Sequence, residues 1–284
     1  MTELRIRMMQ DMRIRNYSPH THRIYIDLVA RFAKHFKKSP DQLGPEDIRA
    51  YQVFLLEEKK ASVAVLTQSV CALRFLYKVT LGRDWPVEYI PYPKQPKKLP
   101  LVLSREQVAR LIESVVNLKH KTILMTIYSG GLRVSELTRL QVGDIDSERM
   151  MIFIRQGKGK KDRLVPLSPI LLKQLRTYWI KYRPPKPWLF PGEPSHRPLN
   201  RFSIALMVKA ARSKARLSKG VSPHTLRHCF ASHLLESGVD IRTIQILLGH
   251  TSVRSTQVYT HVSRKNVLST QSPLDLLPVI SSTF

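Results

Sequence analysis

The sequence predicts a mainly α-helical protein of two domains, the second of which is mixed α+β with one small β-hairpin. Apolar residues recur at helical spacing through residues 1–90. Prolines and lysines then cluster in residues 91–100, which is typical of a stiff, extended linker. Over residues 101–284, two short apolar runs flank a basic, glycine-rich turn among further helical patterns.

Capping residues mark where several helices begin. Ser18 precedes Pro19, which is the preferred order of an N-cap and a first helical residue. Pro45 is followed by two acidic residues, as at a helix start. Ser104 stands three residues before Gln107, the spacing of a capping box. We therefore expect helices from each of these points.

The apolar runs at 150–154 and 164–167 enclose the turn at 157–161. Their length and the glycines between them predict a β-hairpin with a basic tip. From residue 168 the pattern is mostly helical again, with a proline-rich break at 184–198.

Charge indicates the kind of partner. The chain has 47 Lys and Arg against 21 Asp and Glu, a net charge of +26. Residues 1–99 hold 18 basic and 10 acidic side chains and the remainder 29 and 11, so both halves are basic. Neutralising phosphates with release of counterions would explain this excess. A membrane surface or the ribosome are alternatives, but membrane binders usually concentrate their charge on one helix or tail.

Composition also argues against two other classes of protein. No apolar run approaches the length that spans a bilayer, and we expect no membrane association. The two cysteines, Cys71 and Cys229, are far apart in sequence and do not indicate a disulfide framework. A reducing, cytoplasmic location fits this usage.

Two candidate phosphate ligands follow glycines. Arg133 comes after two glycines and near a helix start, where backbone N–H groups and the helix dipole favour a phosphate. The alternative is a surface ion pair between Arg133 and Glu136. Lys158 lies between two glycines and could clamp a phosphate or donate a proton, although a solvated turn is the commoner reason for such a lysine.

A histidine-rich helix is expected after residue 222. His224 and Arg227 would share one of its faces with His228. The two histidines have the spacing of zinc ligands, but Thr225 stands where the metalloprotease motif has its glutamate, and no C-x-x-C pair accompanies them. We therefore expect no metal.

The last candidates are His250, which follows the helix-ending signal Gly249, and Tyr259. Alone, each would more often be structural. In a basic chain without a carboxylate cluster, however, arginine, lysine, histidine and tyrosine together suit metal-free attack on a phosphodiester. Arginines would offset charge on the phosphate, tyrosine would be the nucleophile, and histidine and lysine would handle protons.

Read together, these motifs resemble the tyrosine recombinase (phage integrase) family, most strongly its small Xer-type members. The matching segments, in order, are 131–137, 157–163, 224–228, 247–250 and 259–261. The resemblance covers nearly the whole chain. It implies a helical, SAM-like, core-DNA-binding domain over 1–90, a linker over 91–100 and a catalytic domain over 101–284.

The resemblance also implies a role for each matching residue. Arg133 and Arg227 would bind the scissile phosphate, His224 and His250 would hydrogen-bond it, and Lys158 would protonate the leaving 5′-hydroxyl. Tyr259 would be the nucleophile and Glu136 would support Arg133. DNA would also be contacted by basic residues of the linker and the hairpin, namely Lys94, Lys97, Lys98, Lys160, Lys161 and Arg163.

The implied activity is site-specific recombination of double-stranded DNA through a 3′-phosphotyrosyl intermediate and a Holliday junction, with no cofactor. The implied assembly is a homotetramer on DNA formed from free monomers, with some part of residues 268–284 docked on a neighbour. We expect a bacterial, nucleoid-associated protein. The tail at 272–278 is similar to that of integron integrases, although residues 167–221 are too few for the insertion those enzymes carry. A type IB topoisomerase and a non-catalytic DNA-binding module are the competing functions.

Overall fold

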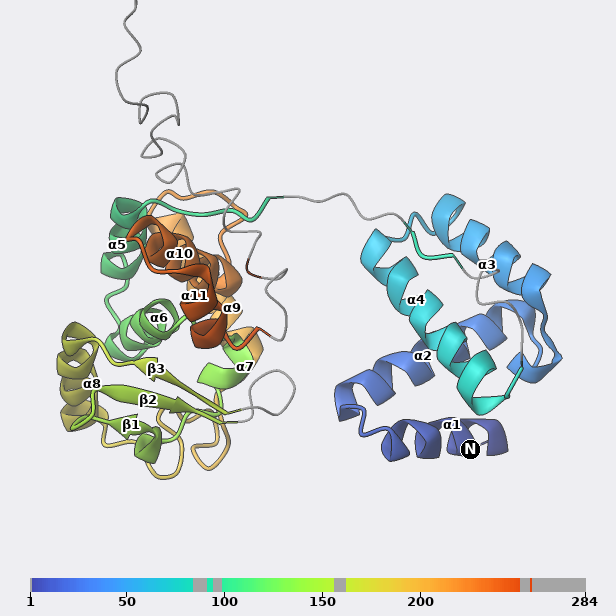
Figure 1. Cartoon of the computed structure of the whole chain (residues 1–284), viewed down its shortest axis with the longest axis horizontal. Helices are drawn as coiled ribbons and strands as arrows, with labels where there is room; N and C mark the ends of the chain where they lie inside the picture. The colour runs from blue at the N-terminus through green and yellow to red at the C-terminus, as the bar shows by residue number, and fades with distance from the viewer. Residues whose placement is uncertain (1, 84–90, 94–98, 156–161, 251–255, 257–284) are drawn as a thin grey trace, which may run out of the picture. The chain divides into compact units, whose positions relative to one another are not determined.

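A computed structural model describes residues 2–83, 91–93, 99–155, 162–250 and 256 of the chain. The chain divides into two compact units, Met1–Lys97 and Lys98–Phe284 (Figure 1). The first is helical and the second combines helices with a three-stranded sheet, so the predicted fold class is confirmed. The predicted linker lies partly outside the described residues and stays a prediction.

The first unit is a set of helices around one apolar core. Ser18 caps its second helix, because the Ser18 hydroxyl accepts a hydrogen bond from the backbone N–H of Thr21 at 3.1 Å. Phe32 and Tyr51 pack edge to face within the core. The elements are α1 (Glu3–Ile14), α2 (Pro19–Phe36), η1 (Pro40–Gln42), α3 (Pro45–Glu57), α4 (Val63–Phe75) and the π-helical turn η2 (Leu76–Thr80).

The expectation that no apolar run approaches bilayer-spanning length needs correction, because the continuous stretch Val63–Thr80 is long and apolar enough to cross a membrane by length and composition alone. Half of it is buried inside the unit, and its residues Leu66, Val70 and Leu73 belong to the core. The stretch therefore has the character of a core helix of this unit.

The second unit is mostly helical and carries a small antiparallel sheet of order β1-β2-β3 to one side of its helices (Figure 1). Its first helix carries the predicted capping box between Ser104 and Gln107. The helices are α5 (Arg105–Glu113), α6 (Leu118–Gly130), α7 (Val134–Leu137), η4 (Val142–Asp144), α8 (Pro169–Tyr182), α9 (Arg201–Lys214), α10 (Pro223–Glu236) and α11 (Ile241–Leu248). The strands are β1 (Ile145–Asp146), β2 (Met151–Ile154) and β3 (Arg163–Pro166).

The predicted β-hairpin is confirmed as the pair β2 and β3, which join antiparallel with Ile152 opposite Val165 and Ile154 opposite Arg163. Its tip lies outside the described residues. Successive strand residues point to opposite faces, so Arg163 shares the buried face of β3 with Val165. Strand β1 was not predicted, because two residues are too short to show a period.

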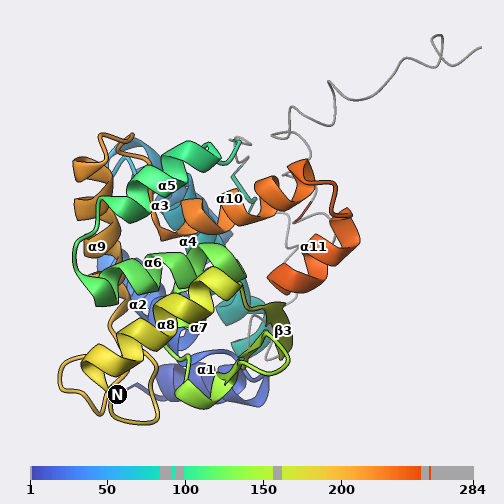
Figure 2. The same ribbon diagram turned by 90° about the vertical axis from the view of Figure 1, so that its left-hand side faces the viewer.

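Helix α6 lies at the centre of this unit and packs against α8 on one side and α10 on the other (Figure 2). Helix α11 packs against α10 and also against β3. The C-terminal end of α11 is thereby brought to the beginning of β3.

Helix α6 ends in a turn that only glycine fits well. Gly131 has φ +58° in the left-handed region, and its N–H donates to the carbonyl of Ile127. A Cβ on Gly131 would lie 2.4 Å from Cδ1 of the buried Phe230 ring. Both backbone strain and a steric clash therefore oppose any side chain at this position.

We predict that Gly131→Ala lowers the free energy of unfolding by more than about 2 kcal/mol, because strain and overpacking add. The matched control is Gly238→Ala, since Gly238 has φ +87° but a Cβ added to it would meet no other atom within 4 Å. It should cost only about 1–2 kcal/mol. Urea denaturation of both variants measures the difference, and equal losses would contradict the role of Phe230.

Candidate active site

Arg133 stands between α6 and the short helix α7, where it is the N-cap residue. Its backbone N–H donates to Oε2 of Glu136 at 2.8 Å, and its guanidinium donates to Oε1 of the same carboxylate at 2.6 Å. Glu136 therefore caps the helix and holds the arginine side chain at once. The Arg133 side chain remains 18% exposed, more than its partner at 3%.

Two further arginines converge on the Glu136 carboxylate. Arg163 makes a bidentate ion pair, with N–H groups at 2.9 Å from Oε1 and 2.7 Å from Oε2. Arg227, from α10, places Nη1 3.7 Å from Oε2. The carboxylate thus gathers guanidinium groups from three separate parts of the chain, which we call the arginine cluster: Arg133, Arg163 and Arg227.

The C-terminal end of α11 contributes a second set of acceptors to the arginine cluster. Three successive backbone carbonyls of α11 and its cap each accept a hydrogen bond from a different arginine. The pairs are Arg163 with Leu247 at 2.7 Å, Arg227 with Leu248 at 2.6 Å and Arg133 with Gly249 at 3.4 Å. The last carbonyls of a helix lack partners within it and carry its negative dipole end, so they favour cations.

The charge of Glu136 is maintained by its partners. Burial would raise the pKa of this carboxyl, but hydrogen bonds and charge from Arg163, followed by hydrogen bonds from Arg133, outweigh burial and lower its pKa to about 2. Three guanidinium groups face one carboxylate, so the cluster retains a net positive charge. Such a site can bind a phosphate.

The two predicted histidines lie at the ends of helices near the cluster. His224 is in the first turn of α10, where partial burial, then the charges of Arg227 and Arg133, lower its pKa. His250 follows the left-handed cap Gly249, and its Nδ1 is 2.9 Å from the hydroxyl of Thr256. Thr256 is fully buried, and sequence reasoning gave it no role in the site.

The structure thus brings together Arg133, Glu136, Arg227, and the ends of α10 and α11 that bear His224 and His250. The predicted nucleophile Tyr259 and the predicted acid Lys158 lie outside the described residues, as do the predicted DNA contacts Lys94, Lys97, Lys98, Lys160 and Lys161. Within the described ranges, no group of three His, Cys, Asp or Glu residues is placed to hold a metal ion.

The prediction that Arg163 contacts DNA is wrong for this structure. Its side chain is 6% exposed and its donors are directed to Glu136 and to the carbonyl of Leu247. The sequence did not indicate which face Arg163 takes, because its neighbours Leu164 and Val165 are both apolar although only Val165 is buried.

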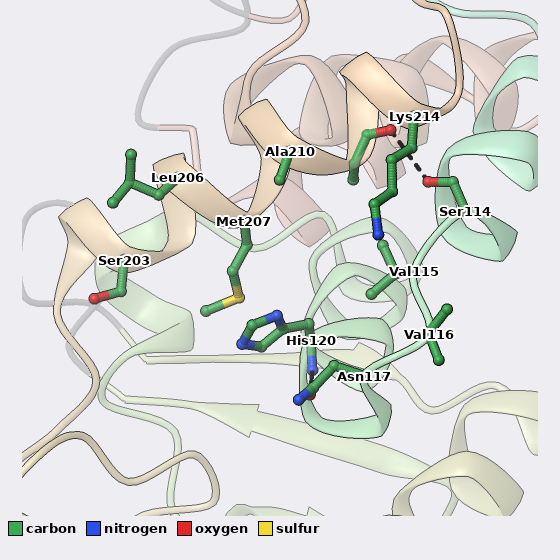
Figure 3. A pocket seen from close by; sticks show the side chains of 11 residues that line it. Ser114, Val115, Val116, Asn117, His120, Ser203, Leu206, Met207, Ala210 and Lys214 are labelled. Atoms are coloured by element: carbon green, nitrogen blue, oxygen red, sulfur yellow. Dashed lines mark hydrogen bonds between the residues drawn. The ribbon is translucent and has the colours of Figure 1, made fainter.

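A separate groove lies between the start of α6 and helix α9 (Figure 3). Its volume is about 710 Å³, and its walls include Val116, His120, Leu206 and Met207. None of the predicted site residues lines this groove, so its shape does not bear on the arginine cluster.

Comparison with known proteins identifies the family. Residues 102–266 match the Phage integrase family, and residues 4–87 match its N-terminal SAM-like domain. A Sinorhizobium fredii protein, y4qK, described as an integrase/recombinase, is 50% identical over 279 residues, which are 98% of this chain and 90% of that protein. Tyrosine recombinase XerA of Pyrococcus horikoshii is 38% identical over 75% of each chain. The chain belongs to the phage integrase family.

Solved structures agree with this assignment. The crystal structure of XerA recombinase is 33% identical and covers 94% of this chain and 95% of its own, with a TM-score of 0.55. XerH site-specific recombinase, in a post-cleavage complex with palindromic difH substrate, has a TM-score of 0.75 at 22% identity, covering 90% and 80% of the two chains, and shares the fold. The chain is a site-specific recombinase of the tyrosine type.

The low pKa of Glu136 predicts how stability changes with acidity. The folded-state pKa of about 2 lies below the ordinary value of 4.5, so the stabilisation is present above pH 4.5 and is lost as pH falls toward 2. The full effect is roughly 3 kcal/mol.

We therefore expect wild type to lose more unfolding free energy between pH 6 and pH 3 than Glu136→Gln, whose amide does not titrate. Urea denaturation followed by circular dichroism at both pH values measures the two losses. Glu136→Gln should be less stable than wild type at pH 6, but its free energy of unfolding should change less between pH 6 and pH 3. The same acid loss in both proteins would contradict the ion-pair account.

Proposed function

We propose that this recombinase cleaves DNA by attack of Tyr259 on a scissile phosphate that Arg133 and Arg227 bind. The observation that supports this most is the shared carboxylate of Glu136, which holds two arginines from distant parts of the chain beside one another. Guanidinium groups so placed can donate to the nonbridging oxygens and offset the charge that develops in the transition state.

The step is a transesterification. The Tyr259 oxygen bonds to phosphorus while the bond from phosphorus to the 5′-oxygen breaks, which leaves a 3′-phosphotyrosine and a free 5′-hydroxyl. Lys158 supplies the proton to the leaving oxygen. His224, whose pKa is lowered by partial burial and by the charges of Arg227 and Arg133, and His250 hydrogen-bond the phosphate and assist the loss of the tyrosine proton.

Rejoining reverses this chemistry with a 5′-hydroxyl from the partner duplex. The phosphotyrosyl bond conserves the energy of the phosphodiester, so the cycle needs neither ATP nor a metal. Two such exchanges, with a Holliday junction between them, recombine two duplexes. We propose that a homotetramer carries them out, that some part of residues 268–284 docks on a neighbouring copy, and that the protein is a free monomer before it binds DNA.

The DNA contacts that we propose are the lysines of the linker and of the hairpin tip, Lys94, Lys97, Lys98, Lys160 and Lys161. Lysines on both units suit a protein that is basic in each half, and their counterion release would make binding steeply dependent on salt. We propose that the protein acts at the bacterial nucleoid in the cytoplasm, where its double-stranded DNA substrate would lie. The kinship to integron integrases, suggested by residues 272–278, stays a prediction.

The covalent intermediate is the direct test of Tyr259. We expect wild type, in EDTA, to form a protease-sensitive protein–DNA adduct on nicked duplexes that carry candidate sites from its genomic neighbourhood. Tyr259→Phe should bind the same DNA and form none, because phenylalanine has no oxygen to attack phosphorus. Tyr182→Phe, which removes an exposed hydroxyl from α8, is the control and should react as wild type.

A denaturing protein gel separates the outcomes. Binding without an adduct in wild type would favour the non-catalytic DNA-binding module. An adduct retained by Tyr259→Phe would assign the nucleophile elsewhere. Adduct formation on single duplexes with relaxation of supercoils, but without joining of two duplexes, would favour the topoisomerase.

The proposed role of Lys158 as proton donor can be tested by the rate of DNA cleavage. Lys158→Ala should slow cleavage of ordinary DNA by about 100-fold or more, because the 5′-oxygen then leaves without its proton donor. A substrate with sulfur in place of that 5′-oxygen should restore the rate to near wild type, since a thiolate leaves unprotonated.

Lys160→Ala is the matched control for the proton-transfer test. It should weaken DNA binding but keep the wild-type ratio of oxygen-substrate to sulfur-substrate rates in single-turnover cleavage. If sulfur fails to rescue Lys158→Ala, the proton donor is another group.

A further inference from the structure

Arg163 belongs to the arginine cluster but, unlike Arg133 and Arg227, has no role in the proposed chemistry. Arg163 is the first residue of β3, the second strand of the hairpin, and its side chain is 6% exposed. Its two terminal nitrogens donate to both oxygens of Glu136, and its Nε donates to the carbonyl of Leu247. One guanidinium therefore ties β3 to α7 and to the end of α11.

The bidentate pair with Arg163 determines how strongly Glu136 interacts with the other two arginines. Arg163 occupies both carboxylate oxygens at 2.9 and 2.7 Å, whereas Arg227 remains 3.7 Å from the nearer one. Arg163 is also the partner that lowers the pKa of Glu136 most. Without Arg163, the Glu136 carboxylate would attract Arg133 and Arg227 more strongly. It would then compete with a phosphate for the same guanidinium groups.

Packing around Gly249 shows how closely Arg163 fits the end of α11. Gly249 has φ +61°, and a Cβ there would lie 3.1 Å from Cδ of Arg163 and 3.2 Å from its Nη1. The residue after Gly249 is His250. Loss of the Arg163 side chain would remove its 2.7 Å hydrogen bond to the Leu247 carbonyl, at the end of the helix that precedes this predicted catalytic histidine.

We propose that Arg163 is a positioning residue of the recombinase: by satisfying Glu136 and the Leu247 carbonyl, it keeps Arg133 and Arg227 available to the scissile phosphate and His250 in place. The proposal rests on the proposed function. It requires the planar fork of arginine, because a lysine ammonium is a point charge that cannot make the two parallel hydrogen bonds and the third to Leu247 in the same geometry.

The test separates the rate of chemistry from binding and folding. Arg163→Lys, Arg163→Gln and wild type are compared in single-turnover cleavage of a nicked duplex at saturating DNA, which gives a rate constant and an amplitude. We expect the rate constant to fall by about 100-fold in Arg163→Gln and about tenfold in Arg163→Lys. The amplitude and the dissociation constant for DNA should stay within about threefold of wild type.

Arg155→Gln is the matched control. Arg155 follows β2 in the same hairpin and pairs with the buried Asp144 at 2.6 Å. Its own side chain is 53% exposed, so its loss removes an ion pair with one buried partner, away from the arginine cluster. It should lower thermal stability and leave the cleavage rate constant within about threefold of wild type. If Arg163→Gln does not fold, Arg163→Lys, which keeps the positive charge, carries the comparison.

Three results would overturn the proposal. A wild-type rate constant in Arg163→Lys and Arg163→Gln, with only amplitude or stability reduced, would make Arg163 purely structural. A loss confined to DNA affinity would make it a DNA contact. Absence of any adduct with wild type would instead remove the proposed function, and this inference with it.

Discussion

The carboxylate of Glu136 is the group on which the site depends. It lies almost fully buried, yet it stays charged because Arg163 and Arg133 donate to both of its oxygens. A buried charge of this kind is stable only while its partners remain, and loss of any one leaves the others uncompensated. The same pairing that stabilises the fold therefore fixes the spacing of the arginines proposed to bind phosphate.

The fold delivers these groups from segments that are far apart in sequence. Gly131 ends α6 just before Arg133, whose side chain pairs with Glu136. Gly249 ends α11 so close to Arg163 that an added Cβ would lie 3.1 Å from the arginine Cδ. The final carbonyls of α11, which a helix leaves without internal partners, accept hydrogen bonds from the cluster. Among the residues that the structure describes, helix ends therefore supply most groups of this site.

Much of the fold and part of the site were predictable from local rules. The caps at Ser18 and Ser104, the β-hairpin and the helix end at Gly249 each follow from residue chemistry over a few positions. Burial of Arg163 was not foreseen, because a basic residue beside a lysine-rich turn suggests a solvent-facing role. The convergence of three arginines on successive carbonyls depends on tertiary contacts between α11, β3 and α10, which no local spacing encodes.

The most direct test of this account is a crystal structure of the wild-type protein trapped covalently on a nicked duplex. We predict that Arg133 and Arg227 lie within hydrogen-bond distance of the nonbridging oxygens of a phosphate joined to Tyr259, while Arg163 keeps both bonds to Glu136. A phosphate bound by Arg163, or a Glu136 released from the arginines, would contradict the account.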